Sequence, residues 1–218
     1  MPTKPPRRTR QRILETSLLL FNRLGEPNVT TADIADEMNI SPGNLYYHFR
    51  NKDEIIGELY AAHEASLAPL LDVPAGRSVS AEDLWLLLHL QFERMGEYRF
   101  FYRDLDQITS RNRRIAMRFA GLIRRREAAV QALADGLARD GVLHATPRER
   151  AALARNVALV STCWMSFQRV SHGATAHTHG DAARLDPGEA AYQALALVAP
   201  FLVGDARTLV ERLGDNYL

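Results

Sequence analysis

The sequence predicts an all-α protein, and three observations lead to this prediction. Apolar residues recur at helical spacing along nearly the whole chain of 218 residues. No run of alternating apolar and polar residues is long enough to indicate a β-strand, and helix-capping residues precede most of the apolar patterns. A composition of 46% hydrophobic and 24% charged residues is typical of a globular protein with a sizeable core.

The first two predicted helices are short segments with clear ends. Residues 13–24 place their apolar side chains on one face, and this pattern stops at Gly25 and Pro27. Thr30 is followed three residues later by Asp33, a pair similar to a capping box. This pair predicts the start of a second helix, whose apolar residues Ile34, Ala35 and Met38 cover only about two turns.

Two further caps follow closely. Ser41 is a favourable N-cap residue, and proline, here Pro42, is favoured at the first helical position. A third short helix is therefore expected over residues 42–48. Asn51 caps a longer fourth helix that ends near Pro74.

The rest of the chain continues as helices. Apolar patterns and caps predict helices over residues 80–95, 100–108, 115–137, 147–172, 187–202 and 205–213. Pro200 is expected to kink or shorten its helix, because proline lacks the N–H that an inner helical turn needs. We therefore expect a head over residues 1–52 and a helical body over residues 53–218.

The charges and the cysteine content limit the possible classes of protein. The net charge is only +1, but residues 1–52 carry eight Lys/Arg against five Asp/Glu, and residues 99–126 carry nine arginines against two acids. The single cysteine, Cys163, allows neither an internal disulfide nor a multi-thiolate zinc site, so a reducing cytoplasm fits best. The longest apolar run, residues 84–90, is far shorter than the ~20 residues that span a bilayer, so no membrane association is expected.

Residues 30–52 have the arrangement of a helix-turn-helix, in which two short helices follow a packing helix and the second enters the DNA major groove. At the start of that second helix, Pro42 and Gly43 add little bulk, and Asn44 can pair bidentately with an adenine edge. Lys52, in the first turn of the next helix, can meet a phosphate beside free N–H groups. The sequence therefore predicts binding of double-stranded DNA.

Hydroxyl, phenol and imidazole groups around this helix supply further donors for phosphates. The predicted DNA-binding residues are Thr30, Thr31, Ser41, Pro42, Gly43, Asn44, Tyr46, Tyr47, His48 and Lys52.

The stretch from Val29 to Ile56 resembles the DNA-binding domain of the TetR family of bacterial transcriptional regulators, and the resemblance covers residues 8–58. It rests on Thr30-Thr31, Ile34-Ala35 and above all Leu45-Tyr46-Tyr47-His48-Phe49 followed by Lys52. The resemblance implies a three-helix DNA-binding head, a body that binds a ligand and dimerises, and repression relieved by a small molecule. Ala32 departs from members that read a base with a longer polar residue there.

A homodimer is expected, because two recognition helices about one DNA turn apart, ~34 Å, fit a palindromic operator. The predicted helices over residues 147–172 and 187–202 carry apolar stripes beyond what one small bundle needs. These stripes consist of Leu153, Val157, Val160, Trp164, Tyr192, Leu195, Ala199 and Leu202.

The expected effector is an apolar or aromatic small molecule held within the body. Core packing is the competing interpretation for each of its predicted contacts, and an acidic effector on the face formed by Arg111, Arg114, Arg118 and Arg125 is an alternative. The predicted effector-binding residues are Tyr60, His63, Trp85, His89, Phe92, Phe101, Phe119 and Trp164, with Gln91 as a further polar group.

No cofactor, bound metal or catalytic residue is expected. His172, His177 and His179 lack the spacing and the carboxylate pair of a metal site. Asp104 and Asp106 show no nucleophile–base spacing with the histidines, which argues against a helical enzyme. The remaining alternative is a helix-turn-helix protein with an architectural or interaction role and no effector control.

Overall fold

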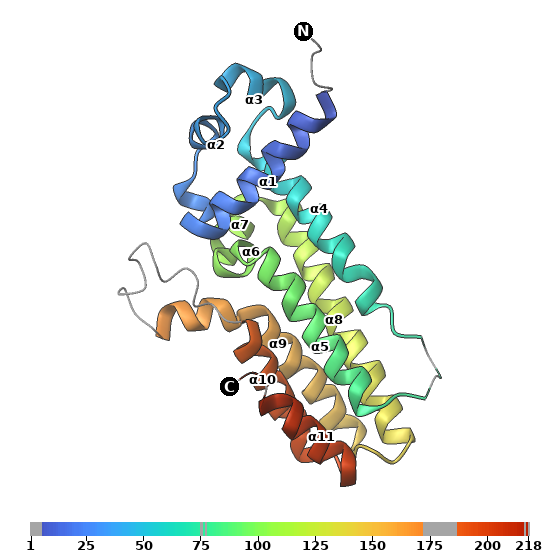
Figure 1. Ribbon diagram of the computed structural model, residues 1–218. Helices are drawn as coiled ribbons and strands as arrows, with labels where there is room; N and C mark the ends of the chain where they lie inside the picture. The colour runs from blue at the N-terminus through green and yellow to red at the C-terminus, as the bar shows by residue number, and fades with distance from the viewer. Residues whose placement is uncertain (1–5, 75, 77, 172–186, 216, 218) are drawn as a thin grey trace.

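A computed structural model describes residues 6–74, 76, 78–171, 187–215 and 217 of the chain (Figure 1). The helices in chain order are α1 (Pro6–Leu24), α2 (Thr31–Glu37), α3 (Pro42–His48), α4 (Lys52–Leu71), α5 (Ala81–Glu97), α6 (Phe100–Arg103), α7 (Leu105–Arg111), α8 (Arg113–Arg139), α9 (Pro147–Ser171), α10 (Pro187–Val198) and α11 (Gly204–Asp215). Short 3₁₀ turns cover Glu26–Asn28 and Ala199–Phe201. The described residues form no strand, and the prediction of an all-α fold is confirmed.

The helices of the head begin at the capping residues that the sequence indicates. Thr30 Oγ1 accepts a hydrogen bond from the Asp33 N–H, and the Asp33 carboxylate accepts one from the Thr30 N–H in return. Ser41 Oγ accepts from the Asn44 N–H ahead of α3, and Asn51 caps α4 in the same way. Each cap satisfies an N–H that a first helical turn leaves without a partner.

The head packs around a small apolar core. Its fully buried members include Ile13 and Phe21 of α1, Ile34 of α2, Leu45 of α3 and Phe49 after α3. Full burial of such side chains contributes about 1.5–3 kcal/mol each. The core therefore fixes α3 against α1 and α2 and decides which face of α3 remains outside.

The body lies below the head in Figure 1, and α4 leads from one into the other. α9 packs against both α8 and α10, while α10 and α11 also pack against α5. Pro200 has the expected effect, because α10 ends at Val198 and the chain continues as a 3₁₀ turn. None of the described helices is long and apolar enough to cross a bilayer.

One predicted helix is wrong. Residues 100–108 form the two short helices α6 and α7, which are separated at Asp104. The buried Asp104 carboxylate accepts a hydrogen bond from the backbone N–H of Glu26, 78 residues earlier in the chain. A contact with so distant a partner has no local sequence signal.

Candidate DNA interface and effector site

The N-terminal half of α3 faces away from the rest of the head. Pro42, Gly43 and Asn44 are exposed, whereas Leu45 and Phe49 on the opposite side are fully buried. Among the described residues the Asn44 side-chain amide has no hydrogen-bond partner. Its donor and acceptor are therefore both available to a base edge, as a bidentate contact with adenine requires.

The aromatic residues of α3 extend this surface. Tyr47 is 80% exposed, and its ring lies edge-on to the ring of His48, with 5.2 Å between centroids. Tyr46 is half-exposed, and its hydroxyl lies 2.9 Å from Thr31 Oγ1 at the start of α2. The contact joins two predicted DNA-binding residues from both helices of the helix-turn-helix, so their hydroxyls present one polar site.

The two capping hydroxyls differ in what they can still donate. Thr30 Oγ1 donates to the Asp33 carboxylate at 2.7 Å, and the hydrogen bonds from Thr30 lower the pKa of that carboxyl. Ser41 Oγ accepts from the Asn44 N–H, which leaves its own hydrogen available. Of the two, Ser41 is the better placed to donate to a phosphate.

Lys52 lies inside the junction between the head and the body. Its Nζ donates to the carbonyls of Glu26 at 3.0 Å and Val29 at 2.8 Å, and lies 2.8 Å from the Glu26 carboxylate. These partners use all three ammonium donors. The side chain thus has a structural role here, and its contact with a phosphate stays a prediction.

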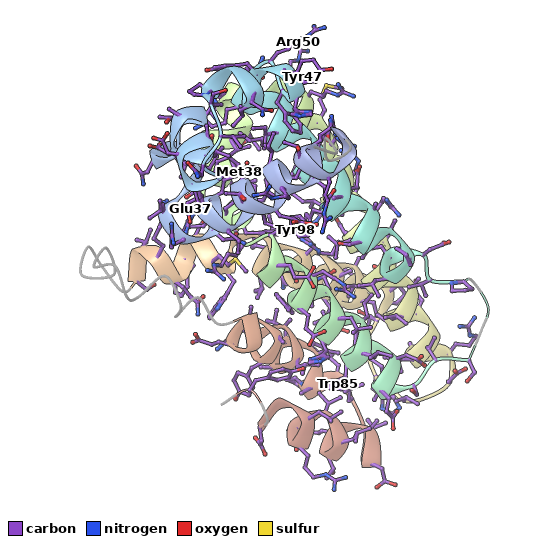
Figure 2. All side chains as sticks on the ribbon, turned by 45° about the horizontal axis from the view of Figure 1, so that its top comes forward. Glu37, Met38, Tyr47, Arg50, Trp85 and Tyr98 are labelled. Carbon is purple, nitrogen blue, oxygen red and sulfur yellow. The ribbon has the colours of Figure 1, made fainter. Side chains whose placement is uncertain are left out.

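Arg50 is a cation that the sequence reasoning did not include among the DNA contacts. Figure 2 shows it beside Tyr47 at the end of the head, with its side chain directed outward. Arg50 is exposed and forms no ion pair with any described residue, so it is available for a phosphate. By contrast, the Arg10 guanidinium in the basic N-terminal segment pairs with Glu58 and lies 4.5 Å from the Phe49 ring centroid.

Polar contacts join the head to α6 and α7 of the body. The fully buried Glu26 carboxylate lies 2.7 Å from Arg111 of α7 as well as near Lys52. Arg103 of α6 donates to the carbonyls of Phe21 and Asn22 at the end of α1. The end of α1 and the turn that follows it are therefore fixed directly to α6 and α7, in addition to the continuous α4.

Four predicted effector residues lie together in the body. Tyr60, His63, Phe101 and Phe119 are buried, and the Tyr60 ring lies 5.2 Å from Phe101 and 5.8 Å from Phe119 between centroids. His63 Nε2 lies 2.8 Å from the Tyr102 hydroxyl. Burial and the Arg126 guanidinium lower the pKa of His63 to about 3, so the imidazole is neutral at pH 7.

The other predicted effector residues lie elsewhere. The Trp85 ring stacks on His89 with 5.0 Å between centroids, and His89 Nδ1 lies 2.7 Å from the Tyr217 hydroxyl. Figure 2 shows Trp85 far along α5 from Tyr98, whose ring lies 4.9 Å from that of His63. At 1.5 Å per residue, Trp85 on α5 and Tyr98 directly after α5 are about 20 Å apart. The predicted set is therefore not one site in this structure.

Two members of the set occupy other surroundings. Phe92 is buried within the apolar core. Trp164 is half-buried on α9, where its ring lies 5.3 Å from that of the exposed Phe167. A hollow between α10 and α11 contains none of the predicted effector residues and is lined by Tyr192, Leu195, Ala196, Ala199, Pro200, Arg207, Val210, Glu211, Gly214 and Asp215.

Arg126 of α8 is a buried cation that the sequence reasoning missed. It is fully buried and donates to Thr162 Oγ1 at 3.0 Å and to the Tyr102 hydroxyl at 3.2 Å. The sequence does indicate its burial, because residue 126 continues the helical spacing of Phe119 and Leu122 and lies four residues before Val130. The predicted arginine face is instead exposed or paired, with Arg111 on Glu26 and Arg118 on Glu64 among its contacts.

Four of the eight residues in the predicted dimer stripes are not available to a second protomer. Leu153, Val157, Leu195 and Leu202 are buried within the single chain, where α9 and α10 pack on their neighbours. The exposed apolar face of α9 carries Leu159, Cys163, Phe167 and Val170 instead. These residues follow helical spacing, so they form one continuous strip on the surface.

The described residues contain no group of three or more His, Cys, Asp and Glu side chains suited to a metal ion. The candidate histidines His172, His177 and His179 lie outside the described residues. Of the two acids considered for catalysis, Asp104 is buried against Arg103 and the Glu26 N–H, whereas Asp106 is exposed.

Comparisons with known proteins agree with this architecture. Residues 13–59 match the family model of bacterial regulatory proteins of the tetR family, and residues 62–210 match a model described as bacterial transcriptional repressor. A TetR-family transcriptional regulator from Marinobacter aquaeolei VT8, known from a crystal structure, is 37% identical over 96% of this chain and 98% of its own, with a TM-score of 0.81.

Other relatives match over a short stretch or in the fold alone. A probable acrEF/envCD operon repressor of Escherichia coli K12 is 38% identical over 53 residues, which is 24% of this chain and 24% of that protein. A putative transcriptional regulator from Saccharomonospora viridis, solved in complex with choline, is 19% identical over 91% of this chain and 99% of its own, with a TM-score of 0.65. The two family models together with the Marinobacter structure show that the chain belongs to the TetR family of bacterial transcriptional regulators.

Proposed function

We propose that this protein is a homodimeric repressor that binds a palindromic operator and leaves it when a small molecule binds in the body. The observation that carries the DNA-binding part is the exposed start of α3, where Asn44 has a free side-chain amide between the small residues Pro42 and Gly43 and the exposed Tyr47. Small residues allow close approach to the base edges, and the amide can read them.

The exposed strip on α9 supports the dimer. Leu159 is 59% exposed and Phe167 is 58% exposed, although both are apolar and lie on a helix in the middle of the body. A two-fold interface would bring the strip of one protomer against the same strip of its partner. Residues 1–52 would then form two DNA-binding heads and residues 53–218 the shared body.

The dimer has a direct test in sedimentation of the full chain and of two glutamate variants. Leu159→Glu should give monomers at micromolar concentration, because it places a carboxylate in the proposed interface. Met117→Glu changes a residue of similar exposure (65%) on α8 and should leave the dimer intact. Monomeric parent protein, or equal loss of association in both variants, would contradict the interface.

The effector-dependent part of the proposal is supported by the buried polar network around His63, Tyr102 and Arg126. It lies close to α6, which contacts the head, so a ligand there has a short path to the DNA-binding surface. A ligand that favours the non-binding state by ~3 kcal/mol would weaken operator affinity about 100-fold.

The decisive experiment is selection of bound sequences from random duplex DNA, with and without candidate effectors. A repressor of the proposed kind should yield one palindromic sequence and lose it in the presence of an effector. Enrichment without sequence preference, and no thermal shift with any compound, would instead favour the architectural protein without effector control.

A further inference from the structure

Arg126 is a buried cation without a buried anion. None of its side chain is exposed, although a guanidinium stays protonated in proteins. Its hydrogen-bond acceptors are Thr162 Oγ1, the Tyr102 hydroxyl and, at 3.5 Å, Met95 Sδ. In the described part of the chain, no carboxylate oxygen lies within 4.0 Å of it.

The neighbouring titratable groups do not supply the missing negative charge. Burial raises the pKa of the Tyr102 phenol and that of Tyr60, so both stay neutral. His63 is neutral for the same reason and in any case carries no negative charge. A buried charge that lacks an opposite charge is costly, and proteins normally pair it.

Several buried polar atoms around Arg126 lack a hydrogen-bond partner within the described residues. They are Arg126 Nε, His63 Nδ1, Tyr60 Oη and Gln91 Oε1, which come from α8, α4 and α5. Gln91 Nε2 donates to Ser161, the neighbour of the Arg126 acceptor Thr162. Donors and acceptors from several helices thus lie around the guanidinium, which contacts Met95, while the Phe119 ring packs on its partner Tyr102.

We propose that Arg126 binds the carboxylate of the effector and that the effector is an organic monoacid with an apolar or aromatic remainder. This inference rests on the effector-controlled function proposed above. A carboxylate matches the forked donors of a guanidinium and balances its single charge, whereas a phosphate dianion would leave one buried charge in excess. The apolar rings around the site then accept the rest of the molecule.

The site also explains how binding would reach the DNA. Tyr102 of α6 contacts both Arg126 and His63, and the next residues, Arg103 and Asp104, hold the end of α1 and the turn after it. A carboxylate that takes over the Arg126 donors competes with the Tyr102 hydroxyl. Any resulting displacement of α6 is passed to the head within two residues.

The test measures binding of monocarboxylates from hexanoate to tetradecanoate and of phenylbutyrate, each matched with the alcohol of the same carbon skeleton. Calorimetric titration of the full-length protein without DNA gives the affinities. The acids that fit the apolar surroundings should bind about 100-fold more tightly than their alcohols, as two charge-assisted hydrogen bonds predict. Binding of no acid, or equal binding of acids and alcohols, would overturn the proposal.

Three variants assign the preference to this residue. Arg126→Met should remove the acid preference, and without ligand it should unfold at the same or a higher denaturant concentration, because an unpaired buried charge has been removed. Arg126→Lys keeps the charge but not the fork and should lose about 10-fold in acid affinity. Arg124→Met changes an exposed arginine on the same helix, outside the predicted arginine face, and should keep the full preference. An unchanged preference in Arg126→Met and Arg126→Lys would reject the assignment.

The design separates this inference from the function on which it rests. Operator release by a neutral or cationic compound alone would reject the acid and leave the repressor function intact. Failure to select any operator would reject the repressor function, while the titrations without DNA would still report on Arg126.

Discussion

Lys52 and Arg50 are two nearby cations at the edge of the head for which the structure predicts opposite roles. We predict that Lys52→Met lowers the stability of the protein and leaves the number of phosphate contacts unchanged. We predict the reverse for Arg50→Met. The reason is that Lys52 Nζ has three partners inside the junction, whereas the exposed Arg50 side chain has no ion-pair partner among the residues described.

The magnitude follows from the partners that Lys52 would leave behind. The Glu26 carboxylate, 0% exposed, would keep only Arg111 at 2.7 Å, and two carbonyls would lose a charged donor. Hydrogen bonds to charged groups contribute about 1.5–3 kcal/mol each, and breaking a buried pair costs about 3–5 kcal/mol. Because Lys52 and Arg111 are both partly exposed, we expect a loss of about 3 kcal/mol in the free energy of unfolding.

Urea unfolding and the salt dependence of operator binding measure the two roles separately. Lys52→Met should lower the unfolding midpoint and keep the slope of log affinity against log salt concentration. Arg50→Met should keep stability within about 0.5 kcal/mol and reduce that slope by about 0.9 for each head of the proposed dimer. A reduced slope with unchanged stability in Lys52→Met would refute the reasoning and assign Lys52 to a phosphate.

Three further predictions concern the recognition helix, pH and packing. Asn44→Ala should cost about 1–3 kcal/mol at one operator position in competition among single-base variants, and equal loss on every sequence would assign Asn44 to the DNA backbone. The pKa of His63 is about 3 in the folded chain against 6.5 when unfolded, so the unfolded state binds the proton first as pH falls. Stability should decrease by about 2 kcal/mol more between pH 7 and pH 5 in the parent than in His63→Gln, measured by denaturant unfolding at each pH. Gly136→Ala should destabilise by about 1–2 kcal/mol in thermal unfolding, because the new Cβ would lie 2.3 Å from Val79 Cγ2, whereas Gly57→Ala has open space and should gain about 0.5–1 kcal/mol.

The parts of the fold that were predictable from sequence are those set by neighbours in the chain. Caps act over three residues, so Thr30, Ser41 and Asn51 locate the starts of α2, α3 and α4 within a residue. Helical periodicity likewise identifies the long body helices, and Pro200 correctly predicts the early end of α10. The candidate DNA surface follows from these local signals, because exposure of one face of α3 is fixed once Leu45 on the other face is buried.

Roles that depend on distant partners could not be predicted in this way. The contacts of Lys52 within the junction are one example, because nothing local shows that the chain returns the carboxylate of Glu26 to its ammonium group. The break in the predicted helix at Asp104 is another example. The Asp104 carboxylate accepts a hydrogen bond from the N–H of Glu26, in the turn after α1. The burial of Leu153, Val157, Leu195 and Leu202 within one chain has a related reason. An apolar face on α9 or α10 does not show whether it packs on α8 or on a second protomer.

Arg126 depends both on a local sequence pattern and on contacts between distant residues, and it connects the candidate effector site with the candidate DNA interface. Its position on the apolar face of α8 was readable from the spacing, whereas the absence of an acidic partner required the packed body. Only neutral groups contact this buried positive charge in the ligand-free body. A bound anion would therefore stabilise the conformation of the body that binds it. The Tyr102 contact lies two residues from Asp104, whereas the path along α4 from His63 to Lys52 is about 16 Å long. The short path through α6 therefore favours control of the head from Arg126, with α4 as the second connection that must move with it.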